Sequence, residues 1–424
     1  MKIKKKIACL ALVCALAIPG TIALAGCELG HTHDFNSAPF YEVVTEGGAK
    51  IARSWVECSC GAEDEHKKIE NAVIVTPTTV QDALDGRIVL RGGNYVVTEK
   101  EATETYININ DKVIVFDEGV YNDVIQLRPS KETATVYDAN EYSGIEPENR
   151  TPITGELDIN AFYAYERNFT NLTFVGTENA IFKNFFLVRT GDFSTSTVIF
   201  GEMYNDIVKN DNTFGKYRAF MSIDNLTISR LNFSGARGRV YISNGLHQET
   251  IGSININNCT FITDTPGSDA GPSQNNAAAY IVSWKNGIFG TINFTNNKVD
   301  GHFQGVYTQN ADEVNVVGND ISNTSHNAIA VKSGSDSFTG IIKILNNKVS
   351  NTGDRAIRFG KCADTQIYVE NNTINNGVDS DNELMKSEAL TNTTYSLKNN
   401  THNGELLEDI ENDETPLLVT IIAE

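Results

Sequence analysis

Basic, aromatic and amide side chains recur in register in the second half of this 424-residue chain. Four apolar segments, at residues 239–243, 305–309, 328–332 and 356–360, align so that alternate residues face the same way. The same alignment assigns Ile281 and Ser283 to two outward columns. One flank of the fold should therefore gather the following residues: Tyr241, His302, Tyr307, Gln309, His326, Lys332, Asp354, Arg355 and Arg358.

This flank has the chemistry of a surface that binds a sugar chain. Tyrosine rings offer flat apolar contact, and arginine guanidinium groups bind carboxylates through two parallel hydrogen bonds. The expected contact residues are Tyr241, His302, Tyr307, Gln309 and Asp354. The alternative is that the Lys and Arg residues are ordinary solvated charges, as most such residues are.

A second group of chemically active residues lies near the start of the chain. His31, His33, Cys58, Cys60 and His66 offer nitrogen and sulfur donors of the kind that bind Zn²⁺. We predict a zinc site built from one of the two early histidines, the two cysteines and His66. A redox-labile cysteine pair and a metal-free tether are the alternatives.

The segment around these donors resembles short metal-knuckle modules of bacterial surface proteins. Those modules combine a His-rich start, a Trp and a paired-Cys-Gly turn, which correspond here to residues 31–34, Trp55 and residues 58–61. This chain departs from the pattern because one residue separates its cysteines, whereas two usually do.

The strands that we expect to carry these residues share a repeated sequence motif, here called the phrase. The phrase alternates apolar and polar residues, continues with an Asn pair and ends on an apolar residue, as in Ile342-Lys343-Ile344-Leu345-Asn346-Asn347-Lys348-Val349. The closing apolar residues lie 28, 38, 22, 28 and 25 residues apart: Phe233, Phe261, Val299, Ile321, Val349 and Ile374. A repeat of this length, built on two-residue alternation, predicts a stack of short parallel strands.

Each copy should place one apolar residue in the core and one Asn at a turn. The expected core column is Ile256, Phe294, Val316, Ile344 and Val369. Asn tolerates left-handed backbone geometry, and its amide can bond to the Asn of the coils above and below. We therefore predict that the Asn column, with Cys259 at an Asn position, has a structural role.

The segment from Thr78 to Val97 resembles the entry of right-handed parallel β-helix proteins. It contains a Thr N-cap, a short amphipathic helix, an apolar strand and a Gly-Gly-Asn turn followed by Tyr95. The expected fold is all-β: a right-handed parallel β-helix solenoid with an N-terminal capping helix and a small N-terminal module. The rival fold is a β-sandwich, whose strands lack such a repeated Asn phrase.

The N-terminus has the features of an export signal. Four Lys residues precede an apolar stretch that ends in Leu24-Ala25-Gly26-Cys27. This ending resembles the lipobox of bacterial lipoproteins, in which the Cys becomes the lipidated first residue; an uncleaved anchor helix is the alternative. The resemblance implies an exported protein that a lipid on Cys27 anchors to the outer face of the cytoplasmic membrane.

Composition and charge exclude several classes of protein. The chain is 40% hydrophobic and 21% charged, which is too polar for a membrane channel and too apolar for a disordered chain. Loss of residues 1–26 removes four Lys, so the net charge falls to about −20 − 4 = −24. This charge argues against nucleic-acid partners. The expected domains are a signal peptide at 1–26, a Cys/His module or tether at 27–75, a β-helix at 76–404 and an acidic cap at 405–424.

Residues from about 75 to 404 resemble the pectate-lyase-like β-helix superfamily, which includes polysaccharide lyases, polygalacturonases and surface adhesins. In the lyases, a Lys or Arg abstracts the proton next to a uronate carboxylate, often with the help of Ca²⁺. By this resemblance Lys332 would be the base, with Arg355 or Arg358 as its partner and His326 nearby.

The hydrolase motifs of the same superfamily are incomplete in this chain. His302 follows a Gly but does not precede one, and Asp300, Asp320 and Asp354 fall in different columns. The sequence shows no acidic cluster for Ca²⁺. We therefore expect a surface protein that binds carbohydrate or a cell-surface partner along its flank, with a lyase acting on uronate-containing polymers by β-elimination as the alternative.

Overall fold

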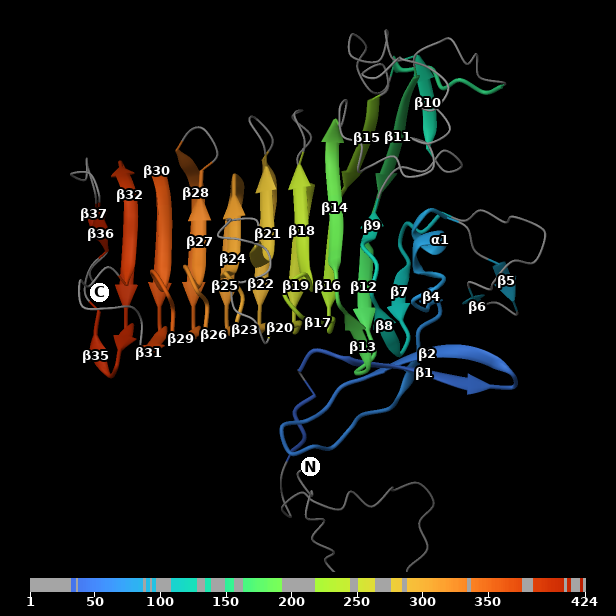
Figure 1. Ribbon diagram of the computed structural model, residues 1–424, viewed down its shortest axis with the longest axis horizontal. Helices are drawn as coiled ribbons and strands as arrows, with labels where there is room; N and C mark the ends of the chain where they lie inside the picture. Colours follow the sequence, from blue (N-terminus) through green and yellow to red (C-terminus); the bar gives the residue numbers. More distant parts are fainter. Residues whose placement is uncertain are drawn as a thin grey trace, which may run out of the picture.

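The computed structural model describes residues 32–35, 37–86, 89–91, 94–96, 108–127, 134–138, 149–155, 163–192, 218–244, 251–263, 276–283, 288–333, 337–375, 384–407, 410–412 and 420–421 (Figure 1). The expected signal peptide, Cys27 and His31 lie outside these residues. Within them the protein is all-β with large, mainly parallel sheets. In this part of the chain, no helix is long and apolar enough to cross a membrane.

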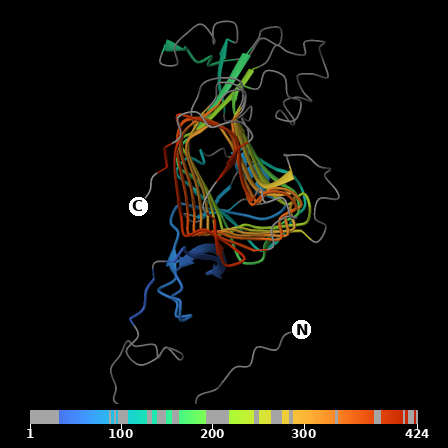
Figure 2. The same ribbon diagram turned by 90° about the vertical axis from the view of Figure 1, so that its left-hand side faces the viewer.

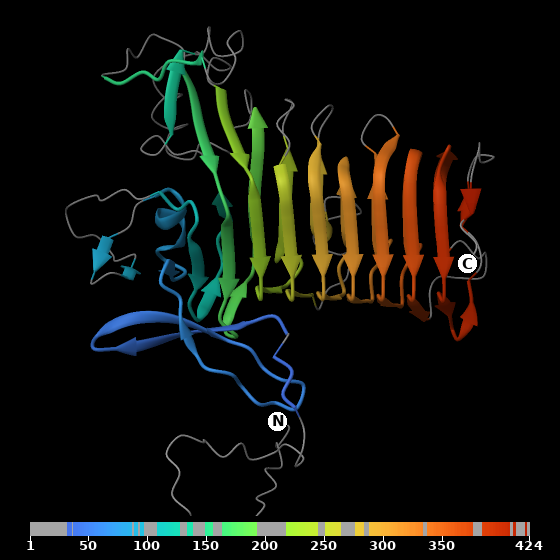
Figure 3. The ribbon, with the colours of Figure 1, turned by 180° about the vertical axis from the view of Figure 1, so that it is seen from behind.

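Strands from successive repeats pair in parallel to form the largest sheet (Figure 3). One series runs through β16 (Asn225–Ser229), β19 (Ile251–Asn257), β22 (Phe289–Thr295), β25 (Ala311–Val317), β28 (Phe338–Leu345), β30 (Ile357–Glu370) and β33 (Thr394–Lys398). A second series in the same sheet runs through β14 (Phe185–Asp192), β18 (Arg239–Asn244), β21 (Ala277–Ser283), β24 (Gln304–Gln309), β27 (Ile329–Lys332), β30 and β32 (Met385–Thr391).

A ten-stranded sheet completes the stack. Its strands are β8 (Gly119–Tyr121), β13 (Ala180–Phe182), β17 (Asn232–Ser234), β20 (Thr260–Ile262), β23 (Lys298–Asp300), β26 (Asp320–Ser322), β29 (Lys348–Ser350), β31 (Thr373–Asn375), β34 (Thr401–His402) and β35 (Glu405–Leu406). Only the last pair, β34 with β35, is antiparallel among them. Seen along the stack, the strands of successive repeats superimpose around a shared interior (Figure 2), an arrangement compatible with a β-helix.

The interior contains the apolar column that the repeat predicts. Ile256, Phe294, Val316, Ile344 and Val369 are fully buried in one continuous core. Each pairs with the equivalent residue of the next repeat, so the side chains stack about one strand spacing, ~4.8 Å, apart. The predicted inward register is therefore confirmed.

The Asn column divides into two structural roles. Asn258, Asn296, Asn346, Asn371 and Asn399 adopt positive φ values of 52–56° at the turn after the first strand of each repeat. The residue that follows each of them is buried, and in three cases, Asn297, Asn347 and Asn372, its side-chain amide donates to the equivalent Asn of the next repeat. The amide ladder runs from Asn297 through Asn319, Asn347 and Asn372 to Asn400, with amide N–O distances of 2.9–3.2 Å.

Cys259 occupies the ladder position one repeat earlier. It is buried, its N–H donates to Asn297 Oδ1 at 2.9 Å, and burial raises the pKa of its thiol to about 12. The prediction that this cysteine is a structural member of the repeat is confirmed.

The first layers carry α1 (Val80–Leu84), whose Val80, Ala83 and Leu84 are buried. Thr79 precedes the helix as predicted, but its hydroxyl forms no cap hydrogen bond; Thr79 Oγ1 accepts instead from Thr76 N–H. The neighbouring strands are β4 (Ala72–Val75), β5 (Val89–Arg91), β6 (Asn94–Val96), β7 (Val113–Phe116), β9 (Ile125–Leu127) and β12 (Leu172–Gly176).

Two further parts extend from the stack. β10 (Thr135–Asp138), β11 (Tyr163–Phe169) and β15 (Arg218–Ile223) project from one side near the N-terminal end (Figure 1). At the other end, β36 (Glu411–Asn412) and β37 (Thr420–Ile421) pair in parallel with β32 and β33. Of the acidic cap expected at 405–424, the structure describes residues 405–407, 410–412 and 420–421.

Residues 40–68 form a separate antiparallel sheet of β1 (Phe40–Glu46), β2 (Ala49–Trp55) and β3 (Lys67–Lys68). Gly47 and Gly48, both at positive φ, make the tight turn between the first two strands. We call this segment, with the residues that precede it from His33, the N-terminal module.

Candidate functional site

One outward column on the second strand series carries aromatic residues at one end and cations at the other. Strand register places its members in this order: Tyr241, Tyr280, Tyr307, Ala330, Arg358 and Lys386. The Tyr280 ring lies 5.1 Å from the Tyr241 ring and 5.1 Å from the Tyr307 ring. These tyrosines form an apolar cluster separate from the main core.

The sequence alignment was wrong by one residue in β21. Ile281 pairs with Ile242 and lies in the main core, so Tyr280 takes the outward position that was assigned to Ile281. Likewise Ser243 pairs with Val282, whereas Ser283 pairs with Asn244. The sequence could not reveal this shift, because the long segment between β20 and β21 lacks the repeat phrase and so leaves the alignment of β21 undetermined.

Lys332 and Arg358 share one carboxylate oxygen. Lys332 Nζ donates to Glu388 Oε1 at 2.7 Å, and Arg358 Nη2 donates to the same atom at 3.2 Å. Burial alone would raise the pKa of Glu388, but hydrogen bonds and positive charge from the two cations outweigh it and lower that pKa. Sequence reasoning missed Glu388, although Met385-Lys386-Ser387-Glu388 continues the strand register by one more repeat.

His326, Asp354 and Arg355 form a second charged group beside this one. His326 Nε2 lies 3.2 Å from Asp354 Oδ2, and Arg355 Nη1 donates to Asp354 Oδ1 at 2.5 Å. His326 and Asp354 occupy equivalent corners in successive repeats, where Thr324 and Thr352 donate to their backbone carbonyls at 3.0 and 3.3 Å. The repeat therefore brings together the imidazole and the carboxylate that the sequence predicted on this flank.

The two groups interact electrostatically. Burial lowers the pKa of His326, the Asp354 charge opposes that effect, and Arg358, Arg355 and Lys332 lower it further. His326 therefore lies within the electrostatic reach of all four charged groups. The His326 ring also stacks on Phe303 at 5.0 Å.

The charge of this flank is opposite to that of the chain. Lys332, Arg355 and Arg358 pair with two acids, Asp354 and Glu388, which gives 3 − 2 = +1 with His326 neutral. The whole chain carries −20. The ionic side chains of these pairs are 15–34% exposed, so solvent and ligands can reach them. We call this set the cationic flank.

Two predicted contact residues are not at the surface. Tyr307 is 1% exposed, Gln309 Nε2 donates to its hydroxyl at 2.7 Å, and burial raises its pKa to about 12. His302 is 2% exposed, and burial lowers its pKa to about 3. In this conformation a ligand on the flank would touch Tyr241, Gln309 or the charged groups before it reached Tyr307 or His302.

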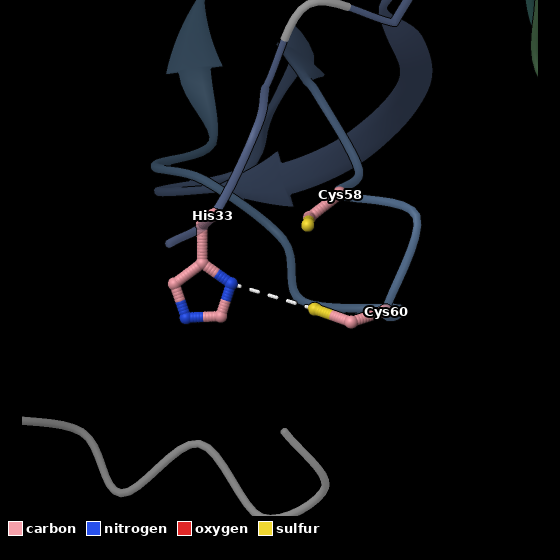
Figure 4. A group of neighbouring side chains, drawn as sticks. All are labelled: His33, Cys58 and Cys60. Carbon is pink, nitrogen blue, oxygen red and sulfur yellow. Dashed lines mark hydrogen bonds between the residues drawn. The ribbon is translucent and has the colours of Figure 1, made fainter. Parts of the chain in front are cut away.

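The N-terminal module brings three of the predicted metal ligands together (Figure 4). The ligand atoms of His33, Cys58 and Cys60 all lie within 4.8 Å of one another, and His33 Nδ1 is 3.4 Å from Cys60 Sγ. Tetrahedral Zn²⁺, with bonds of roughly 2.0 Å to nitrogen and 2.3 Å to sulfur, holds such atoms about 3.5 Å apart. This group could hold a metal ion.

A tight turn aims the two sulfur atoms at the same point. Cys58 N–H donates to Ala62 O at 2.7 Å and Gly61 N–H donates to Cys58 O at 2.8 Å, with Gly61 at φ 83°. One intervening residue is therefore sufficient here, because the chain reverses immediately after Cys60.

His66 is not part of this group, which corrects the predicted ligand set. Its Nδ1 bonds to Glu42 at 2.7 Å, its Nε2 to Glu63 at 3.1 Å, and its ring stacks on Trp55 at 4.4 Å. Both imidazole nitrogens are thus engaged by carboxylates.

No protein-family model, curated protein or solved structure matches the chain. We therefore infer the function from two sites, the cationic flank and the group of three metal ligands in the module.

Proposed function

We propose that this chain is a right-handed parallel β-helix of the pectate-lyase-like superfamily, exported as a lipoprotein anchored through Cys27. The parallel register of strands about 22 to 38 residues apart and the buried Asn ladder support the fold assignment. In this reading α1 caps the first coil and the tail strands β36 and β37 cap the last. Loss of acyl labelling in Cys27→Ser cells, with the chain still exported, is the expected result for the anchor.

The function that the geometry supports best is binding of an acidic polysaccharide along the cationic flank. One observation carries this proposal: a partly exposed cluster of net charge +1 is present on a chain of −20. Arg and Lys at neighbouring repeats suit the regularly spaced carboxylates of a uronate polymer. Tyr241, at the edge of the tyrosine cluster, would provide apolar contact to a sugar ring.

A uronate lyase is the second candidate. It is favoured by the position of Lys332 near Arg355, Arg358 and His326, because all three cations act electrostatically on His326. However, Lys332 Nζ donates to Glu388, whereas a base needs a free lone pair. Binding without turnover is therefore the primary proposal. Ca²⁺ would be needed only by the lyase, with Asp354 and Glu388 as the nearest carboxylates of the flank.

Titration of residues 28–424 with polygalacturonate or alginate, compared with a neutral glucan, tests the binding function. We expect Lys332→Gln with Arg358→Gln to weaken polyuronate binding at least tenfold, because a hydrogen bond to a charged group contributes about 1.5–3 kcal/mol. Lys343→Gln is the matched control, since Lys343 also forms an exposed ion pair, with Glu313 at 2.6 Å, on a different strand. Equal affinity for all three proteins would refute the proposal.

The same mixtures decide between binding and lysis. A rise in ultraviolet absorbance from unsaturated products, lost in Lys332→Ala, would establish the lyase. Binding with no absorbance change would support the binding protein.

We also propose that the metal at His33, Cys58 and Cys60 is Zn²⁺. Two thiolates and one imidazole form a donor set that Zn²⁺ prefers over the oxygen-seeking cations. A fourth ligand would complete a tetrahedral site; His31, the other early histidine of the sequence prediction, lies outside the described residues.

A further inference from the structure

The described residues between His33 and Phe40 (34–35 and 37–39), here called the strap, are held at several points. Ser37 Oγ donates to Glu57 O at 2.7 Å, which ties the strap to the turn that carries the cysteines. Two carbonyls of the strap, those of Ala38 and Pro39, accept hydrogen bonds from Arg230 at 2.7 and 3.2 Å. The strap thus joins the metal-ligand group to a residue almost two hundred positions later in the chain.

Arg230 also covers the end of the strap. Its guanidinium carbon lies 3.6 Å from the centroid of the Phe40 ring, which in turn stacks on Trp55 at 5.6 Å. A cation–π contact of this kind adds to the two hydrogen bonds. A single side chain of the parallel stack therefore contacts both the backbone of the strap and Phe40, the first residue of β1.

The position of Arg230 in the repeat is unusual. Ser229 pairs with Asn257, so Arg230 occupies the corner that Asn258, Asn296 and three later Asn residues fill, at the same left-handed backbone geometry, φ 57°. Asn adopts this geometry readily, whereas a long side chain does so at a cost. An Arg at this one corner indicates a role beyond the turn, and the contact with the strap supplies it.

The rest of the module also packs against the stack. Ala52 of β2 joins Ile74, Val115 and Val175, on three neighbouring parallel strands, in one buried cluster. Lys50 Nζ lies 2.5 Å from Asp117 Oδ2 at the edge of this contact. The module is therefore seated on the outer face of the first layers, beside the stack as Figure 2 shows.

We propose that Zn²⁺ bound by His33, Cys58 and Cys60 acts as a clasp that fastens the strap and so secures the module on the parallel stack through Arg230. The inference rests on the zinc site proposed above. His33 lies before the strap, whereas the cysteines lie after β2, so one ion would cross-link two segments. A small module buries little apolar surface, so metal-binding free energy becomes folding free energy there.

Hydrogen exchange of residues 28–424, with one equivalent of Zn²⁺ or with a chelator, tests the clasp. We expect Zn²⁺ to slow exchange in the strap and β1 at least tenfold and to leave the Asn-ladder strands unchanged. His33→Ala should abolish this difference. His66→Asn is the matched control, because its imidazole lies in the same module but outside the ligand group, and it should keep the bound zinc.

Arg230→Asn tests the link to the stack. Asn is the residue that the equivalent corners use, so the turn is preserved while the grip on Ala38, Pro39 and Phe40 is lost. We expect this variant to bind Zn²⁺ fully, yet to show faster exchange in β1 and in the outer face of β4.

The outcomes separate the two proposals. Absence of stoichiometric zinc by elemental analysis, together with no thiolate absorbance on Co²⁺ addition, would overturn the zinc site and the clasp. Bound zinc without slower exchange in the strap would overturn the clasp alone. Exchange in Arg230→Asn equal to that of the parent protein would overturn the link to the stack.

Discussion

Removal of one buried ladder amide should destabilise the protein far more than removal of an amide on the outer surface. Asn347 is 1% exposed and forms four side-chain hydrogen bonds. Its Nδ2 donates to Val316 O and Asn372 Oδ1, and its Oδ1 accepts from the N–H and the Nδ2 of Asn319 at 2.9 Å.

The magnitude follows from these contacts. A buried hydrogen bond contributes about 1 kcal/mol net, so four give roughly 4 kcal/mol for Asn347→Ala. The buried Asn319 N–H would also lose its acceptor, which costs about 1–3 kcal/mol and makes the estimate a lower bound. Such a loss is a large part of the ~5–15 kcal/mol stability typical of a domain.

Urea unfolding monitored by circular dichroism measures this loss. Asn315→Ala is the matched control: Asn315 is half-buried in an outward amide row, its Nδ2 donates to Asn293 Oδ1 at 2.9 Å, and its side chain also hydrogen-bonds to Glu313. We expect this control to cost about 0.5–1.5 kcal/mol, because water can replace the lost partners at this half-buried position. Equal losses in the two variants would refute the view that the buried ladder dominates coil-to-coil bonding.

Three further results are expected. Burial lowers the pKa of His302 to about 3, so folding stability should fall as pH drops below ~6.5, the pKa of histidine in an unfolded chain. The urea midpoints at pH 7 and pH 4.5 should therefore differ less in His302→Gln than in the parent protein. An equal difference in the two proteins would contradict this assignment. Hydrogen bonds to two glutamates raise the pKa of His66. Its contribution to folding stability is therefore complete at low pH and is lost as pH rises through that raised pKa. An NMR titration midpoint at or below the ordinary pKa of histidine would show the reasoning to be wrong. Gly305→Ala would place a Cβ 2.4 Å from Ala328 O and should cost about 1–3 kcal/mol, whereas Gly155→Ala, with nothing within 4 Å, should be nearly neutral in the same unfolding assay.

The parallel strands and their inward faces could be predicted because the repeat encodes them locally. Alternation fixes which side of a strand is buried, and the Asn pair fixes where each strand ends. The core column from Ile256 to Val369 is buried as expected.

Prediction failed where the spacing between repeats changed. The segment before β21 gives no register, so Tyr280 was assigned to the wrong face. Glu388 was missed because its strand, β32, lacks the Asn phrase, although β32 pairs with β30 of the preceding repeat. In the module, the position of His66 depends on non-local carboxylates, Glu42 and Glu63, which no local pattern reveals.

The closing layer of the stack has a consequence for self-association. A parallel stack leaves backbone groups at its last strand that a second molecule could extend, which is the usual route to fibres. Here Leu407 N–H donates to Asn400 O at 2.9 Å, just after β34 and β35 reverse the chain direction. At this end of the ten-stranded sheet an incoming copy would therefore meet a hairpin, with the Asn400 carbonyl already bonded within the chain.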